Sequence, residues 1–158
     1  YCLQNPFQIL PLTKSNENMS KRFIQYAAIF GALSVILGAF GAHALKEFVE
    51  ADAVATFDTG VRYQFYHTFA LLALGILYRR MPGKLMEWAG ILFISGIVLF
   101  SGSLYLLTYL NATETVGLKG VGAITPLGGV CFIAGWICLF IQSLKPSVHR
   151  QRSKEPDA

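Results

Sequence analysis

Charged side chains are scarce in this sequence. They make up 14% of its 158 residues, whereas soluble domains usually carry about 25%, and hydrophobic residues make up 54%. The mean hydropathy is correspondingly high, at +0.49. A chain of this size with so few charges cannot cover a water-exposed surface with polar groups. The composition therefore excludes a soluble enzyme and favours an integral membrane protein of one domain.

Catalytic motifs are lacking as well. The chain has no Gly-x-Ser-x-Gly motif, no glycine loop that would bind phosphate, and no carboxylate within its long uncharged stretches. Cys131 and Cys138 lie seven residues apart on one face of an apolar stretch, where they act as small apolar side chains, and Cys2 lies near the N-terminus. We therefore expect no disulfide bond and no enzymatic activity.

Four uncharged stretches remain, at residues 23–42, 63–78, 88–113 and 120–144. A helix of about 20 apolar residues crosses a hydrocarbon core of roughly 30 Å, so the first, third and fourth stretches are long enough. The second can span if Arg62 and Arg79 at its ends extend their charged groups to the interfaces. We predict an all-α membrane protein, a four-transmembrane-helix bundle with spans at about 23–45, 61–78, 88–110 and 120–144.

Basic residues are unevenly distributed between the two sides of such a bundle. One side receives only Lys46, Arg62 and Lys119. The other receives Lys21, Arg22, Arg79, Arg80, Lys84, Lys145, Arg150, Arg152 and Lys154. The positive-inside rule then places both termini in the cytoplasm. The net charge of +4 comes from these separate flanking segments, so we expect no nucleic-acid partner.

Both ends of the chain differ from the spans in composition. We expect residues 1–18 to be a disordered leader outside the fold, because Met19-Ser20-Lys21-Arg22 looks like a native start, and residues 145–158 to be a flexible cytoplasmic tail. A signal peptide cleaved at Ala42-His43-Ala44 is a competing interpretation. The preceding apolar run of 20 residues exceeds the usual length of about 7–15, which favours a membrane span.

Residues 46–60 are polar and acidic, yet apolar side chains recur among them at helical spacing. Val54, Phe57, Val61 and Phe65 form this stripe, which predicts a short interfacial helix between the first two spans, running into the second. Asp58 and Arg62 would share one face of it and pair, at about 0.3–0.5 kcal/mol. A tight turn is expected at residues 81–84.

Small residues and one proline mark how the helices pack. Ser34, Gly38 and Ala42 repeat every four residues, which predicts a close helix contact, either within the bundle or along a homodimer seam. Pro126 is expected to bend the fourth span and free a carbonyl near Gly122, which Thr125 would help to satisfy. Kinked helices of this kind line the sites of many transporters.

Intramembrane polar side chains are the candidates for function. His43 and His67 are predicted at similar depths near the outer face, where a proton relay, a haem ligand pair or a zinc site with Glu47 are conceivable roles. Their spacing is not diagnostic, so we favour histidines hydrogen-bonded to Tyr63, Gln64 or backbone, with no cofactor. The candidate positions are His43, Asp58, Arg62, Tyr63, Gln64, His67, Ser101, Ser103, Tyr105, Thr125 and Pro126.

An ordered set of motifs resembles a known family. The motifs are Gly38-Ala39-Phe40-Gly41-Ala42-His43-Ala44-Leu45, Tyr63-Gln64-Phe65-Tyr66-His67, Leu99-Phe100-Ser101-Gly102-Ser103-Leu104-Tyr105, Ile124-Thr125-Pro126-Leu127-Gly128-Gly129 and Gly135-Trp136. Over residues 19–144 they resemble the YgdD-like family of small bacterial inner-membrane proteins, domain of unknown function 423, related to transmembrane protein 256. The resemblance implies a four-helix protein of the bacterial inner membrane without an assigned activity or cofactor.

Two functions from different classes follow as hypotheses. The first is a non-enzymatic scaffold or accessory subunit that associates through its helices with a second copy or another membrane protein, with the lipid bilayer as solvent. The second is a small proton-coupled carrier that uses His43, His67 and the Pro126 kink. Small multidrug carriers depend on a membrane-embedded carboxylate, and its absence here favours the scaffold.

Overall fold

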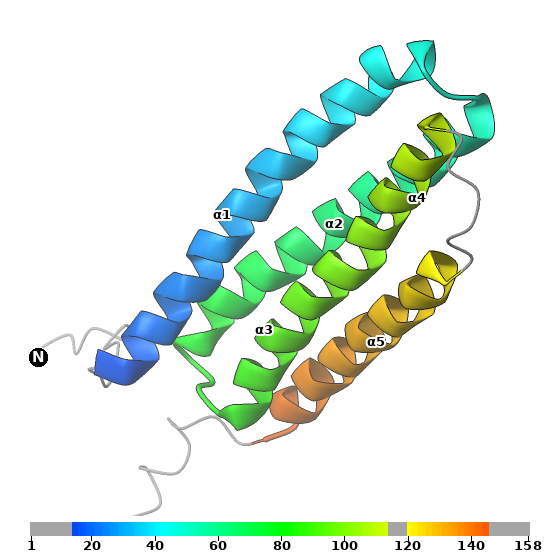
Figure 1. The fold of residues 1–158 in the computed structure, drawn as a ribbon. Coiled ribbons are helices and arrows are strands. Elements are labelled where there is room, and N and C mark those ends of the chain that lie inside the picture. The colour runs from blue at the N-terminus through cyan, green and yellow to red at the C-terminus, as the bar shows by residue number, and fades with distance from the viewer. Residues whose placement is uncertain (1–13, 114–119, 146–158) are drawn as a thin grey trace, which may run out of the picture.

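The computed structural model describes residues 14–113 and 120–145, and this part of the chain is helical throughout, without a strand. Its long helices are α1 (Lys14–Ala42), α2 (Ala51–Tyr78), α3 (Lys84–Gly96), α4 (Gly102–Ala112) and α5 (Ile124–Ser143). Short helical turns join them: η1 (Ala44–Glu47), the π-turn η2 (Ile97–Ser101) and η3 (Val121–Ala123). Because α3, η2 and α4 continue one another, the elements form four rods lying side by side (Figure 1). The all-α prediction is confirmed.

Three of the rods are long and apolar enough to cross a membrane, namely Lys14–Glu47, Lys84–Ala112 and Val121–Ser143. They contain the first, third and fourth predicted spans. The remaining rod, α2, is long but is not among the three, and its first half carries Asp52, Asp58 and Arg62. This matches the sequence, in which the second uncharged stretch is the shortest.

The fold begins earlier than the sequence predicts. Helix α1 starts at Lys14, so residues 14–18, which we expected to be disordered, are helical. Glu17 pairs with Lys21 one turn later at 2.8 Å, and the buried Ser20 hydroxyl donates to the Gly75 carbonyl of α2 at 2.7 Å. The Ser20 bond holds the first turns of α1 against α2, whereas the Glu17–Lys21 pair lies within α1. Residues 1–13 and 146–158, the rest of the expected leader and tail, lie outside the described residues.

The predicted interfacial helix is not a separate element. Helix α2 runs without interruption from Ala51 to Tyr78, preceded only by the short turn η1. Phe57 and Val61 pack with Leu45 in a small apolar cluster, and the buried positions Gln64, Thr68 and Leu71 follow at helical spacing. Because the apolar stripe stays in phase, one continuous helix buries both halves.

The small-residue face of α1 packs within the bundle. A Cβ placed on Gly31 or Gly38 would lie 3.5 Å from Thr68 or 3.6 Å from Val61, and Ser34 between them is 2% exposed. This face therefore lies against α2, as the first of our two interpretations predicted, and it brings the two backbones close together.

Aromatic rings fill much of the core of the bundle, and the rings of Phe23, Phe93 and Phe132 each lie against a glycine of a neighbouring rod. A Cβ on Gly90 would overlap the Phe23 ring, one on Gly96 the Phe132 ring, and one on Gly135 would lie 2.7 Å from the Phe93 ring. The surrounding core cluster comprises Phe23, Ala27, Ala70, Leu71, Leu74, Tyr78, Met86, Ala89, Phe93, Ile97 and Phe132. Substituting any of these glycines would force a ring to move, so the rods fix one another's positions.

Candidate functional site

Buried polar side chains gather at one level of the bundle. Helices α2 and α4 are antiparallel, with Gly60 against Leu104 and Tyr105, and α5 meets the π-turn where Gly128 touches Phe100. These contacts bring side chains from all four rods to a similar height. We call this set the polar layer; its members are Ser34, Gln64, Ser101, Ser103, Tyr105 and Thr125.

Gln64 is the centre of the polar layer. Its side chain is 4% exposed, its Nε2 donates to the Phe30 carbonyl of α1 at 3.1 Å, and its Oε1 accepts from the Tyr105 hydroxyl at 3.0 Å. The Ser34 hydroxyl donates to the same Phe30 carbonyl at 2.8 Å. Both polar atoms of the amide are thus satisfied away from water, and three rods are connected through one side chain.

Helix α5 joins the layer through a pair of hydroxyls. Thr125 Oγ1 and Ser103 Oγ lie 2.7 Å apart, and Ser103 also donates to the Phe100 carbonyl at 2.8 Å. Thr125 therefore pairs with α4 and not with a carbonyl freed by the proline. The sequence identified both hydroxyls but not their pairing, because they are 22 positions apart.

Pro126 lies at the start of a helix, and not within one as the predicted kink requires. Helix α5 begins at Ile124, so Pro126 lies in its first turn, after the short turn η3. The N–H groups of a first turn have no acceptor within the helix, and proline removes nothing there. Pro126 thus marks the start of the helix instead of bending it.

Ser101 occupies the last position of the π-turn. The Gly102 N–H donates to the Ile97 carbonyl five residues back, which widens the helix at this point. Ser101 is completely buried, and within the described part of the chain its Oγ has no hydrogen-bond partner. The sequence pointed to Ser101 as a polar candidate but gave no sign of the π-turn.

His67 lies about one turn deeper than Gln64. Its Nδ1 is 2.8 Å from the Tyr63 carbonyl, and its Nε2 accepts a long hydrogen bond of 3.4 Å from the Trp136 indole of α5. The ring stacks on Phe132 with centroids 3.4 Å apart. A neutral imidazole with its proton on Nδ1 satisfies both contacts. The backbone partner agrees with our prediction, whereas Trp136 was not among the candidate residues.

His43 is far from His67, so the prediction of similar depths is wrong. His43 is exposed beyond the end of α1, while Gly31, twelve residues earlier, lies against Thr68, the neighbour of His67. Twelve residues correspond to about 18 Å along a helix. The two histidines are therefore not placed to bind one haem iron. In residues 14–113 and 120–145, no group of three or more His, Cys, Asp or Glu side chains could hold a metal ion.

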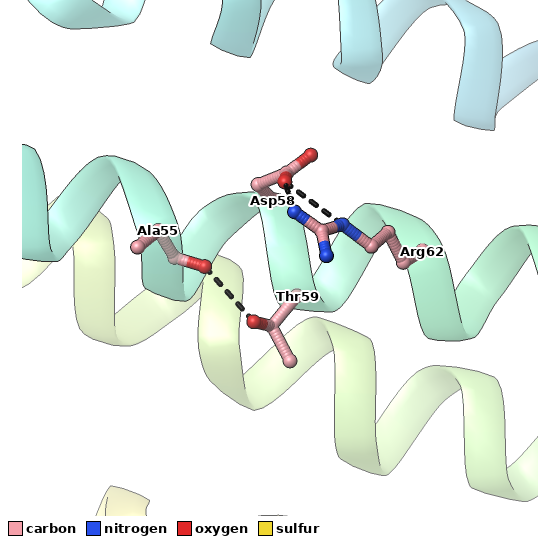
Figure 2. Close-up of polar contacts among 4 residues, drawn as sticks. All are labelled: Ala55, Asp58, Thr59 and Arg62. Atoms are coloured by element: carbon pink, nitrogen blue, oxygen red, sulfur yellow. Dashed lines mark hydrogen bonds and ion pairs between the residues drawn. The ribbon is translucent and has the colours of Figure 1, made fainter.

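Asp58, Arg62 and Tyr63 lie on the outer surface of α2 and not in the polar layer. Figure 2 shows Arg62 reaching back to Asp58, with Nε 2.9 Å from Oδ2, beside the Thr59 hydroxyl that donates to the Ala55 carbonyl. The predicted pair is confirmed, but both side chains are about half exposed, so it adds only a few tenths of a kcal/mol. The Tyr63 ring packs at a tilt against the Phe100 ring, with centroids 4.5 Å apart.

The chain is similar to bacterial proteins whose names describe them as membrane proteins and state no activity. The family described as "Protein of unknown function (DUF423)" matches residues 37–129. The UPF0382 inner membrane protein YgdD of Escherichia coli K12 is 38% identical over 128 residues, which cover 80% of this chain and 93% of the relative. The UPF0382 membrane protein YwdK of Bacillus subtilis 168 is 42% identical over 126 residues, covering 79% and 98%. No solved structure matches the chain.

Proposed function

This chain belongs to the DUF423 family of membrane proteins, and we propose that it is a non-enzymatic helix-packing scaffold or accessory subunit of the bacterial inner membrane. The observation that carries the proposal is the interlocked interior. Rings of one rod lie against glycines of the next, at Gly90, Gly96 and Gly135. A rigid body of this kind suits a protein that presents a fixed surface to a partner.

We further propose that all four rods span the membrane, with both termini in the cytoplasm. Helix α2 is not among the three rods that are apolar enough to span by composition, but its polar side chains Gln64, His67 and Thr68 are buried against its neighbours. Polar groups within a bilayer are tolerated when they face protein instead of lipid. Arg62 and Arg79 then mark the two ends of the α2 span.

The two rods at the edges of the bundle, α1 and α5, offer exposed apolar faces to a partner (Figure 1). On α5, Val130, Ile133, Ile137 and Phe140 are each more than half exposed, while Phe132 on the opposite face is 4% exposed. On α1, Ile29, Val35 and Ile36 are likewise more than half exposed. These apolar faces contact lipid in a monomer and a second membrane protein or another copy in an assembly.

Site-specific crosslinking in native membranes tests the scaffold. A photo-crosslinking residue at Ile133 should give a discrete adduct of reproducible mass, whereas the same residue at the neighbouring, buried Phe132 should give none. Positions 29 and 36 on α1 extend the test to the other outer rod. The absence of an adduct from every exposed position on α1 and α5 would contradict the proposal that these two faces bind a partner.

A proton-coupled carrier is the second candidate, and the burial of the titratable ring of His67 favours it. Its other expected parts do not join that ring, because His43 lies about 18 Å away along the bundle and Pro126 begins a helix. Proteoliposomes with His67→Ala test it directly. A proton flux across the proteoliposome membrane that is lost in the variant supports the carrier, and an unchanged proton flux rejects it.

A further inference from the structure

One end of the bundle gathers exposed cations from all four rods. Arg22 lies near the start of α1, Arg79 and Arg80 follow α2, Lys84 begins α3, and Lys145 follows α5 (Figure 1). Two carboxylates lie nearby: Glu17 pairs with Lys21 and is also near the charge of Arg79, and Glu87 accepts from the Tyr78 hydroxyl at 2.7 Å. Among the described residues, no salt bridge joins these five cations to an acid.

The N-terminus of α3 opens into this cationic end. Gly83 is its N-cap and offers no side chain, so the first N–H groups of the helix have no side-chain acceptor there. Free N–H groups and the helix dipole both favour a bound anion. Arg79, Arg80 and Lys84 flank this helix start within the turn between α2 and α3.

Gln142 of α5 supplies a second, independent sign of a ligand. Its side chain is 6% exposed and packs on Gly83, where a Cβ would lie 3.1 Å from Nε2 and 3.2 Å from Oε1. In the part of the chain that the structure describes, its buried Oε1 accepts no hydrogen bond. Buried amide oxygens are normally satisfied, so this one calls for a donor beside the N-terminus of α3.

We propose that the turn between α2 and α3 binds the headgroup of an anionic phospholipid that also carries hydroxyl groups, such as phosphatidylglycerol. The phosphate takes the N–H groups of the α3 N-terminus and the side chains of Arg79, Arg80 and Lys84. A headgroup hydroxyl donates to Gln142 Oε1. Trp88, one turn into α3 and 57% exposed, is the kind of aromatic residue that lies at a membrane interface, which favours a lipid over free phosphate.

Lipid titrations of the purified full-length chain in detergent test the site, with bound lipid counted by native mass spectrometry. The probes are phosphatidylglycerol, phosphatidylmethanol, which carries the same single negative charge but no headgroup hydroxyl, and phosphatidylcholine. We expect affinity to fall in that order. Removing one arginine should weaken phosphatidylglycerol binding about fivefold, and Arg79→Gln with Arg80→Gln about 25-fold. Lys46→Gln at the other end of the bundle is the matched control and should change nothing.

Two variants of Gln142 separate the hydroxyl contact from charge. Gln142→Met should remove the preference for phosphatidylglycerol over phosphatidylmethanol, and Gln142→Glu should weaken the binding of both by placing a carboxylate beside the phosphate. Equal affinity for phosphatidylglycerol and phosphatidylcholine, or an unchanged affinity in the double arginine variant, would overturn the proposal. So would displacement of the lipid by millimolar inorganic phosphate, which would assign the site to the free anion.

Discussion

Gly128 and Gly129 are neighbours in sequence with opposite tolerance for a side chain. A Cβ on Gly128 would overlap the backbone of Phe100 in the π-turn, whereas one on Gly129 would be 4.0 Å from the nearest atom. We expect Gly128→Ala to lower the free energy of unfolding in detergent by about 1–3 kcal/mol, because a backbone cannot yield as a flexible side chain can.

Gly129→Ala is the matched control for that measurement. It adds the same methyl group one position along α5, and we expect no loss and up to about 1 kcal/mol of gain from helix propensity. Unfolding titrations of both variants in mixed micelles decide the matter. Equal stabilities for the two would mean that α5 does not approach the π-turn as described.

The hydrogen bond between Gln64 and Tyr105 is measurable by a double-mutant cycle. With Gln64→Leu, Tyr105→Phe and the double variant, we expect a coupling energy of about 0.5–2 kcal/mol in the same unfolding assay. Tyr109→Phe removes a hydroxyl from a tyrosine that is 64% exposed and should have almost no effect. Strictly additive single substitutions would show that the two side chains do not interact.

The sequence identified most members of the polar layer, but it did not show which of them form hydrogen bonds with one another. Gln64, Ser101, Ser103, Tyr105 and Thr125 were candidates because polar groups are rare in an apolar stretch. Their pairing depends on which helix faces lie together, and a single sequence does not specify that. Gln142 was missed because glutamine near the end of a span is an ordinary interfacial residue, and Trp136 was missed because a tryptophan within an apolar run shows no partner in the sequence.

Helix α5 offers a direct test of where a proline is tolerated. Pro126→Ala should change stability by less than about 0.5 kcal/mol, because the first-turn N–H has no partner within the helix. Placing a proline one turn later, with Val130→Pro, should cost about 3 kcal/mol or more, although Val130 is 62% exposed. Circular dichroism and unfolding titrations of the two variants measure the contrast. A large loss of stability in Pro126→Ala would contradict this interpretation and support the predicted kink.

The elements predicted best are those that depend on length and apolar composition. Three of the four spans and the turn before Lys84 follow from uncharged runs and turn residues. The π-turn at Ile97–Ser101 has no such signal, because its apolar residues suit an α-helix equally well. The start of α1 at Lys14 depends on contacts of Ser20 with α2, which local sequence does not reveal.

The four-span topology predicts on which side of the membrane single cysteines lie. In a background with the native cysteines replaced by alanine, Lys46→Cys before α2 and Lys84→Cys after it should face opposite sides. A membrane-impermeant maleimide should label position 46 in intact spheroplasts and position 84 only after permeabilisation. Labelling of both positions before permeabilisation would mean that α2 does not cross the bilayer.

The Gln64 amide also limits how the rods can move against one another. Sliding α2 by a single turn, about 5.4 Å, would separate Gln64 from both the Phe30 carbonyl of α1 and the Tyr105 hydroxyl of α4, and sliding α1 or α4 would break one of the two bonds. Lipid tails offer no replacement donors or acceptors, so even helices with smooth apolar flanks cannot shift in register without breaking these bonds. Any large displacement in this molecule is therefore expected to be a tilt or a bend about that height and not a piston stroke.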